Sequence, residues 1–311
     1  MTIALPQNFS IGNAAGVCKS IDLVDQLARS GLNEITLGSI TVEQRPVNSP
    51  GTVHFRTENG ASINALGMPN LGIAAYTDLL QQMVEIAHTA HKLLAISIAP
   101  LQADDLERLL SLCVKAGVDI IELNGGCPNV WDEGQQKRIL SFDIKYLSHS
   151  LQTMLERKSV DGWSGELRVK LSPYSDPGLL AEVAKMIGSM GSKKYRVTVV
   201  TCNTFPNALM FDDTETISRA LTFGDGYGGY SGQGYLPIAL GQVQQFRKHL
   251  GDYHKIIGVG GISSGRAVIE HVLAGANGVQ IGAALYYANN PAKGADNILQ
   301  EIAEFVEGVQ S

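Results

Sequence analysis

The sequence has little of what marks several specialised protein classes. Only 17% of its 311 residues are charged, the net charge is −6 and no Lys/Arg cluster occurs, so a nucleic-acid-binding surface is not expected. No apolar run approaches the roughly 18 residues that a transmembrane helix needs. The segment Met1–Gln7 lacks the basic start and long apolar core of a signal peptide. The four cysteines show no metal-ligand spacing, so we expect reduced thiols, no metal and a cytoplasmic protein.

Glycine, in contrast, is abundant. The chain has 34 glycines, and many follow strand-like apolar runs directly. Because glycine lets the backbone approach another group closely, these positions indicate contact with a ligand or with neighbouring backbone.

Strand-like and helical patterns alternate along the chain. The predicted strands are Gly12–Gly16, Glu34–Gly38, Leu93–Ala99, Asp119–Asn124, Leu167–Leu171, Arg196–Asn203, Lys255–Gly260 and Gly278–Ile281. The predicted helices are Ser20–Arg29, Tyr76–Lys92, Ala103–Ala116, Phe142–Leu155, Pro177–Ile187, Ile238–Leu250, Ser264–Gly275 and Ala295–Val306.

Such alternation predicts an α/β fold with a parallel sheet, and eight units predict a closed (β/α)8 TIM barrel. We expect a single domain over residues 1–311, with long insertions after strands 2, 4 and 6. Two of these insertions are Gln44–Gly72 and Thr204–Tyr235, and long excursions in compact domains are usually functional. The alternative, an open doubly wound sheet, would suit a G-x-G-x-x-G turn after the first strand, which Gly12–Gly16 does not supply.

The fourth predicted strand delivers a thiol to the end of the barrel where active sites lie. Its apolar run ends in a turn that places Cys127 between Asn124 and Asn129. Carboxamides suit a flat polar ligand, and a thiol serves as nucleophile or base. The alternative is a structural cysteine, since free cysteine is often part of a core.

Other strand ends carry polar or glycine residues as well. Ser39, Lys170 and Asn203 fall there, whereas none of the seven histidines does. The turns at Gly260–Gly261 and Gly282 follow strands 7 and 8, the usual phosphate site of such barrels. Alternatively, these glycines only form tight turns, and Lys170 is a solvated lysine at the end of its strand. Taken together, the strand ends favour a phosphorylated organic cofactor without a metal.

In combination, these motifs resemble the dihydroorotate dehydrogenases, FMN-dependent barrels of pyrimidine biosynthesis. The similarity runs along nearly the whole chain. It rests on Ile63–Gly72, Glu122–Asn129, Val169–Leu171, Cys202–Thr204, Gly228–Gly232, Gly258–Ile262 and Gln280–Ala283. The nearest branch is the soluble, dimeric class 1A, which returns its electrons to fumarate. The resemblance therefore implies an oxidoreductase acting on a CH–CH bond, present as a cytoplasmic homodimer.

The resemblance also assigns roles to residues. Cys127 is expected to be the base that takes the ring proton from dihydroorotate. The residues expected to hold dihydroorotate or orotate are Lys19, Asn64, Leu66, Gly67, Met68, Asn124, Asn129, Asn203 and Thr204. Those expected to hold FMN are Ala15, Gly16, Ser39, Asn124, Lys170, Cys202, Gly232, Gly260, Gly261, Gly282 and Ala283.

Two positions depart from the class 1A pattern. That class carries a lysine at the end of the second strand, and Thr36–Thr41 contains none. Lys19, three residues after Ala14–Gly16, stands where the membrane-associated class has its lysine and is expected to replace the missing cation. Gly126 stands where serine is usual. The open alternatives are an FMN oxidoreductase acting on another small cyclic amide or enone, and a flavin-binding protein without catalysis.

Overall fold

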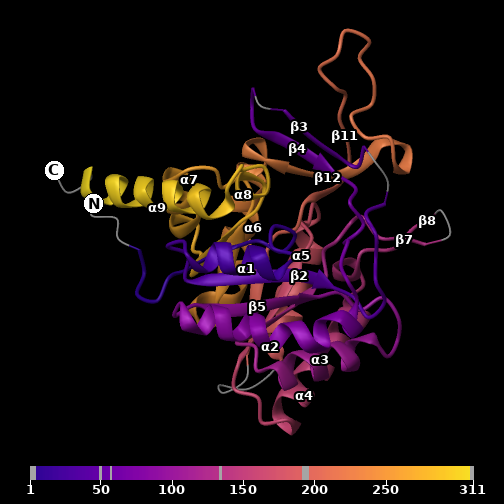
Figure 1. The fold of residues 1–311 in the computed structure, drawn as a ribbon, viewed down its shortest axis with the longest axis vertical. Helices are drawn as coiled ribbons and strands as arrows, with labels where there is room; N and C mark the ends of the chain where they lie inside the picture. Colours follow the sequence, from indigo (N-terminus) through magenta and orange to yellow (C-terminus); the bar gives the residue numbers. More distant parts are fainter. Residues whose placement is uncertain (1–4, 49–50, 57, 133–134, 191–195, 309–311) are drawn as a thin grey trace.

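The computed structural model describes residues 5–48, 51–56, 58–132, 135–190 and 196–308. Eight parallel strands close into a barrel (Figure 1). They are β1 (Ser10–Asn13), β2 (Glu34–Ile40), β5 (Leu93–Ile98), β6 (Ile120–Asn124), β9 (Glu166–Leu171), β10 (Val197–Thr201), β13 (Ile256–Val259) and β14 (Gly278–Ile281). Around the barrel they follow the order β1-β14-β13-β10-β9-β6-β5-β2. The predicted (β/α)8 barrel is confirmed.

Helices connect the strands and surround the barrel. They are α1 (Ile21–Ala28), α2 (Ile73–Thr89), α3 (Asp105–Ala116), α4 (Ile144–Val160), α5 (Pro177–Ser189), α6 (Leu236–Leu250), α7 (Gly265–Leu273), α8 (Ala283–Tyr286) and α9 (Pro291–Gly308). The side chains of Ser20 and Ser264 cap α1 and α7, accepting hydrogen bonds from the backbone N–H groups of Leu23 and Ala267. None of the helices within the described ranges is long and apolar enough to cross a membrane.

Some predicted boundaries were wrong. The first strand is Ser10–Asn13, so residues 14–16 follow the strand and belong to the turn at its carboxyl end. There the N–H of Ala14 bonds to Ile281 O and the N–H of Gly16 bonds to Gly38 O. Helix α8, between β14 and α9, was not predicted, because four residues are too few to show helical periodicity.

The insertions are more ordered than the sequence indicated. The strands β3 (Val53–Arg56), β4 (Ala61–Asn64), β11 (Phe205–Leu209) and β12 (Tyr227–Gly232) form one antiparallel sheet in the order β11-β12-β4-β3. We call it the insertion sheet; it lies above the barrel in Figure 1. The insertion after β6 contains β7 (Trp131–Asp132) and β8 (Gln135–Gln136). Short 3-10 turns occupy Leu140–Phe142, Gly224–Gly226, Gln233–Tyr235 and Gly251–Tyr253.

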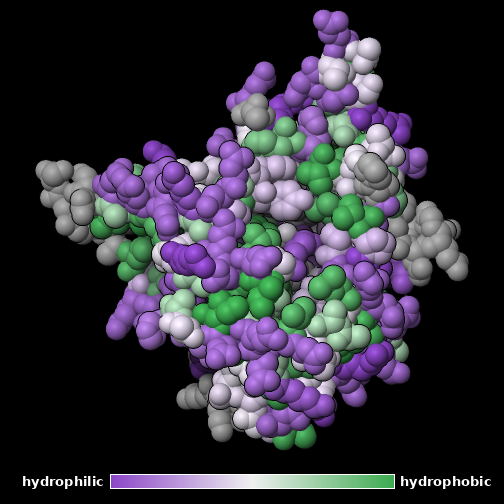
Figure 2. Space-filling model, viewed as in Figure 1, coloured by the Kyte–Doolittle hydropathy of each residue, from purple (hydrophilic) through white to green (hydrophobic). Residues whose placement is uncertain are grey.

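The main apolar core lies between the barrel and its helices, whereas much of the barrel interior is polar. Arg168 on β9 forms a bidentate ion pair with Glu34 on β2, with N–O distances of 2.6 and 2.8 Å. Both side chains are buried. On the surface, hydrophobic residues gather in the middle of the face drawn in Figure 2, below the insertion sheet, among mostly hydrophilic ones. The barrel interior therefore holds paired charges away from solvent.

Candidate active site

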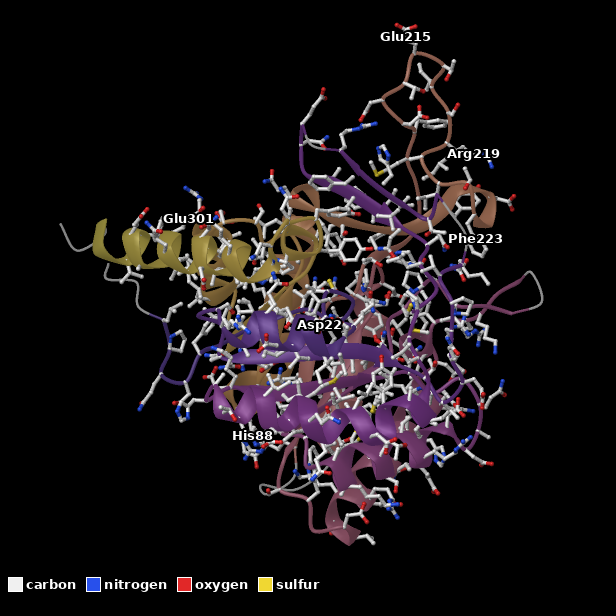
Figure 3. All side chains as sticks on the ribbon, in the orientation of Figure 1. Asp22, His88, Glu215, Arg219, Phe223 and Glu301 are labelled. Atoms are coloured by element: carbon white, nitrogen blue, oxygen red, sulfur yellow. The ribbon has the colours of Figure 1, made fainter. Side chains whose placement is uncertain are left out.

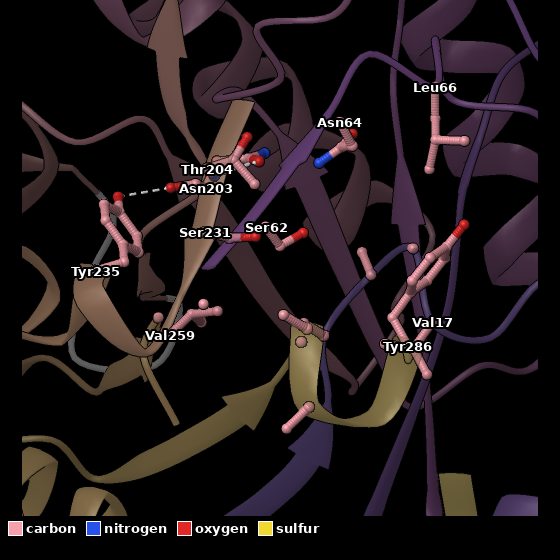
Figure 4. A pocket seen from close by; sticks show the side chains of 18 of the residues that line it. Val17, Ser62, Asn64, Leu66, Asn203, Thr204, Ser231, Tyr235, Val259 and Tyr286 are labelled. Carbon is pink, nitrogen blue, oxygen red and sulfur yellow. Dashed lines mark hydrogen bonds between the residues drawn. The ribbon is translucent and has the colours of Figure 1, made fainter. Parts of the chain in front are cut away.

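A cavity opens between the carboxyl ends of the barrel strands and the insertion sheet. Every residue that the sequence nominated for catalysis, substrate or cofactor lines it. Figure 4 shows part of this wall: Asn64 on β4, Asn203 and Thr204 after β10, and Tyr286 on α8 surround the same space. The fold thus brings together residues that are up to 268 positions apart, from Ala15 to Ala283.

Two hydrogen-bonded groups of carboxamides fix the polar wall. Asn203 Nδ2 donates to Asn124 Oδ1 at 3.0 Å, and Asn124 Nδ2 donates to Ser39 Oγ at 2.7 Å. On the other side, Asn129 Nδ2 donates to Asn64 Oδ1 at 3.0 Å and to its backbone carbonyl at 2.9 Å. Because each amide orientation is held by a partner, the wall is arranged in advance for a flat polar ligand.

Cys127 is half-buried at the edge of this wall. Burial raises the pKa of its thiol, and the backbone N–H of Asn129 and the charges of Lys19 and Arg45 act in the opposite direction. A second cavity, lined in part by Ala99, Val130 and Tyr146, also reaches Cys127. The other three cysteines are fully or almost fully buried, and Cys127 is the thiol that lines both cavities.

Lys19 supplies a cation close to Cys127. Its ammonium donates to the carbonyl of Pro69 at 3.1 Å, which ties the turn after β1 to the loop after β4. Burial lowers the pKa of Lys19 to about 8, and the nearby Cys127 thiol opposes this shift. Lys19 therefore loses its charge at a lower pH than an ordinary lysine does.

The floor of the cavity holds Lys170, whose side chain is 4% exposed. Its ammonium donates to Gln280 Oε1 at 3.1 Å. The lysine lies at the penultimate position of β9 and is buried, so it is not a solvated strand-end lysine.

Glycine loops form the opposite wall. Among the described residues, the backbone N–H groups of Gly261, Gly282 and Ala283 have no acceptor, and all three residues line the cavity. A Cβ at Gly16 would meet nothing within 4 Å, so the cavity extends directly from its backbone. The buried ring of His271 lies beneath Gly260, with its Nε2 atom 3.1 Å from the Gly260 carbonyl oxygen. Burial lowers the pKa of His271 to about 4. The loop therefore rests on a neutral imidazole and presents free N–H groups, as an anion site does.

The family model described as dihydroorotate dehydrogenase matches residues 5–306. The chain belongs to the dihydroorotate dehydrogenase family. Proteins provisionally named dihydroorotate dehydrogenase A (fumarate) from Streptococcus pyogenes and Streptococcus agalactiae are each 30% identical to it, over 277 and 276 residues, or 88% of this chain and 82% of theirs. By this membership the protein is an oxidoreductase of the class that acts on CH–CH bonds.

Gly126, and Gly38 within the stretch Thr36–Thr41 that contains no lysine, lie where the backbone leaves no space for a side chain. A Cβ at Gly38 would lie 2.6 Å from Ser97 O, and φ there is +124°. A Cβ at Gly126 would lie 2.5 Å from Ser172 N. A side chain at either glycine would therefore clash with neighbouring backbone.

We predict that Gly38→Lys lowers the free energy of unfolding by about 2–4 kcal/mol, from backbone strain together with overpacking. Gly117→Lys is the matched control. Gly117 has φ +73° with nothing within 4 Å of its Cβ, so only the strain of about 1–2 kcal/mol applies there. Urea denaturation measures both variants, and equal losses would show that Ser97 yields to the new side chain.

Sequence reasoning missed several residues of this cavity. Phe55 and Tyr287 stack with ring centroids 4.3 Å apart, and Tyr287 OH lies 2.7 Å from Ser62 Oγ, which joins the end of α8 to the insertion sheet. Arg45 and His271, which act on Cys127 and on Gly260 without lining the cavity, were also missed, because neither lies at the end of a barrel strand. His88, by contrast, lies on α2 on the outside of the barrel and pairs with Asp119 at 2.9 Å (Figure 3).

Proposed function

We propose that this protein oxidises dihydroorotate to orotate in pyrimidine biosynthesis, using FMN, with Cys127 as the catalytic base. The observation that supports this most strongly is the grouping of Cys127 and Lys19 with the carboxamide wall, directly beside Lys170 and the glycine loops. We also propose that residues 1–311 form one FMN-binding domain, that the protein is a cytoplasmic homodimer, and that fumarate is its electron acceptor.

The residues of the cavity fit FMN. The free N–H groups of Gly261, Gly282 and Ala283 suit its phosphate, with Gly260 completing the loop. The close backbone of Ala15, Gly16 and Gly232 would suit a flat ring, which Ser39, Asn124, Cys202 and Lys170 would also help to hold. When bound, FMN supplies a hydride acceptor for the substrate carbon.

The chain itself performs the proton chemistry and the positioning. Cys127 as thiolate takes the proton from the ring carbon next to the one that loses hydride. Asn64, Asn124, Asn129, Asn203 and Thr204 hold the amide edges of the pyrimidine. The backbone of Leu66, Gly67 and Met68 closes over it, and the Lys19 ammonium pairs with the carboxylate.

A second candidate is the same chemistry on another small cyclic amide or enone. The stretch Thr36–Thr41 favours it, because the lysine that class 1A carries beside substrate and cofactor is absent there and Gly38 has no space for a side chain. A third reading is a flavin-binding homologue without catalysis.

Anaerobic mixing of the purified holoprotein with dihydroorotate tests these alternatives. The proposed function requires the visible flavin bands to bleach. A flavin that bleaches with another cyclic amide or enone, but not with dihydroorotate, selects the second candidate. A flavin that stays yellow with the whole panel selects the third.

For the cofactor, we predict that FMN copurifies and that Lys170→Ala weakens its retention and slows flavin reduction. The reason is that the buried ammonium would stabilise the negative charge of the reduced ring. The FMN-to-protein ratio after gel filtration and stopped-flow absorbance measure the two effects. Wild-type protein that is colourless and takes up no added FMN would refute the assignment.

A further inference from the structure

Three buried polar side chains form a chain across the barrel below the cavity. Lys170 Nζ donates to Gln280 Oε1 at 3.1 Å, and Gln280 Nε2 donates to Glu122 Oε2 at 2.7 Å. Gln280 and Glu122 have no exposed surface, and Lys170 is 4% exposed. Gln280 stands on β14 and Glu122 on β6, which lie opposite each other in the eight-stranded barrel, so the glutamine side chain bridges its interior.

The groups on either side of the Gln280 amide, Lys170 and Glu122, determine its orientation. A carboxylate only accepts hydrogen bonds and an ammonium only donates them. The amide nitrogen must therefore face Glu122 and the amide oxygen must face Lys170. The Glu122 carboxylate does not contact Lys170, and it influences the lysine electrostatically across the intervening Gln280 side chain.

The charges around Lys170 are few. Burial lowers the pKa of Lys170, and Glu122 and Cys202 oppose that shift. In the layer below, Arg168 is held by Glu34 and by Glu166, which it contacts at 2.8 Å through Nε. The second oxygen of Glu122, Oε1, has no hydrogen-bond partner among the described residues. Glu122 is thus the carboxylate that compensates the charge of Lys170.

We propose that Glu122 and Gln280 are positioning residues that keep Lys170 charged and directed at the cavity floor, so that a bound flavin ring meets a fixed cation. This inference rests on the proposed binding of FMN. The Gln280 amide between Glu122 and Lys170 explains how Lys170 can stay charged and still direct its charge at the cavity. A direct ion pair would cancel the field of the ammonium at the cavity, whereas a carboxylate one side chain further away still compensates a buried charge.

The test is the pH dependence of FMN affinity in Glu122→Gln. Removing the carboxylate lowers the pKa of Lys170 further, and a lysine loses its charge as pH rises through its pKa. We therefore expect the ratio of variant to wild-type FMN Kd to rise about tenfold or more between pH 6 and pH 9, the loss of one charge-assisted interaction. Fluorescence titration of apoprotein with FMN gives this ratio, in which the ionisation of free FMN cancels. The midpoint potential of bound flavin should fall relative to wild type over the same interval.

Two further variants separate this role from a structural one. Glu166→Gln removes a carboxylate from the same barrel that contacts Arg168 and not Lys170, so its Kd ratio should stay flat with pH. The double variant Glu122→Gln/Gln280→Glu moves the carboxylate next to Lys170 and should restore a flat ratio. If Glu122→Gln does not fold, Glu122→Met removes the same carboxylate at similar volume and should show the same rise.

A flat ratio in Glu122→Gln, or in Glu122→Met if that variant replaces it, overturns the inference while leaving the proposed function intact. A rise that the double variant fails to reverse also overturns it, since the effect then does not come from the charge. Wild-type protein that binds no FMN overturns the proposed function itself.

Discussion

Cys127→Ser is expected to slow anaerobic flavin reduction by dihydroorotate by a factor of about 10²–10⁴, the usual contribution of a general base. Serine keeps the size and hydrogen bonding of the thiol but is a far weaker acid, so proton removal suffers while binding survives. FMN content and the Kd for orotate should stay close to wild type. Stopped-flow absorbance measures the reduction rate, and flavin absorbance changes measure orotate binding.

Cys113→Ser is the matched control. Cys113 lies on α3 with no exposed surface, and it is absent from both cavities. Placing a hydroxyl there should cost stability and leave the rate of flavin reduction unchanged. If Cys127→Ser behaved in the same way, losing stability and keeping its rate, Cys127 would be a core residue and no base.

The pH profile of wild-type reduction follows from the same group. A base must first lose its own proton, so the rate rises with pH, and burial places that limb above the ordinary thiol value of about 8.5. Lys19, with a pKa of about 8, loses its charge over a nearby interval. Because Cys127 and Lys19 interact, the apparent pKa values seen in the pH dependence of kcat/KM belong to the pair and not to either residue alone. Cys127→Ser should move the rising limb further upward.

The barrel was predictable because its signals are local. Apolar runs of strand length alternate with amphipathic helices, and short runs that end in polar residues place those residues at one end of a parallel barrel. This alone brought Ser39, Asn124, Lys170 and Asn203 to the same place. The resemblance to dihydroorotate dehydrogenases added residues of the insertions, such as Asn64 and Thr204, which no barrel periodicity locates.

The rest depends on contacts that no local pattern contains. The insertion sheet pairs β4 with β12, about 165 residues apart, and β12 is rich in glycine, which disfavours a strand prediction. The role of Glu122 was hidden because alternation within β6 also suits a solvent-facing residue. Only barrel closure turns its side chain toward Gln280 on the opposite strand.

The strongest test of the substrate is a charge test at Lys19. Orotate and uracil differ by one carboxylate, so a cation that recognises dihydroorotate should distinguish them. In Lys19→Met the KM for dihydroorotate and the Kd for orotate should rise about ten- to a hundredfold, because one charge-assisted hydrogen bond is worth about 1.5–3 kcal/mol. Binding of uracil, which lacks the carboxylate, should change little. Lys185→Met, at an exposed position on α5, is the control for loss of a positive charge.

The sign of the pH dependence gives this test a second readout. Lys19 is charged below its pKa of about 8 and neutral above it, so the Kd of wild type for orotate should rise as pH passes through 8, and the Kd for uracil should not. Lys19→Met should lose this difference between the two ligands. Lys19→Arg should keep tight orotate binding to higher pH if the longer guanidinium is accommodated beside Pro69, because arginine remains charged there. Equal Kd values for orotate in wild type and Lys19→Met would remove the carboxylate from the binding model and favour a neutral cyclic amide as the substrate.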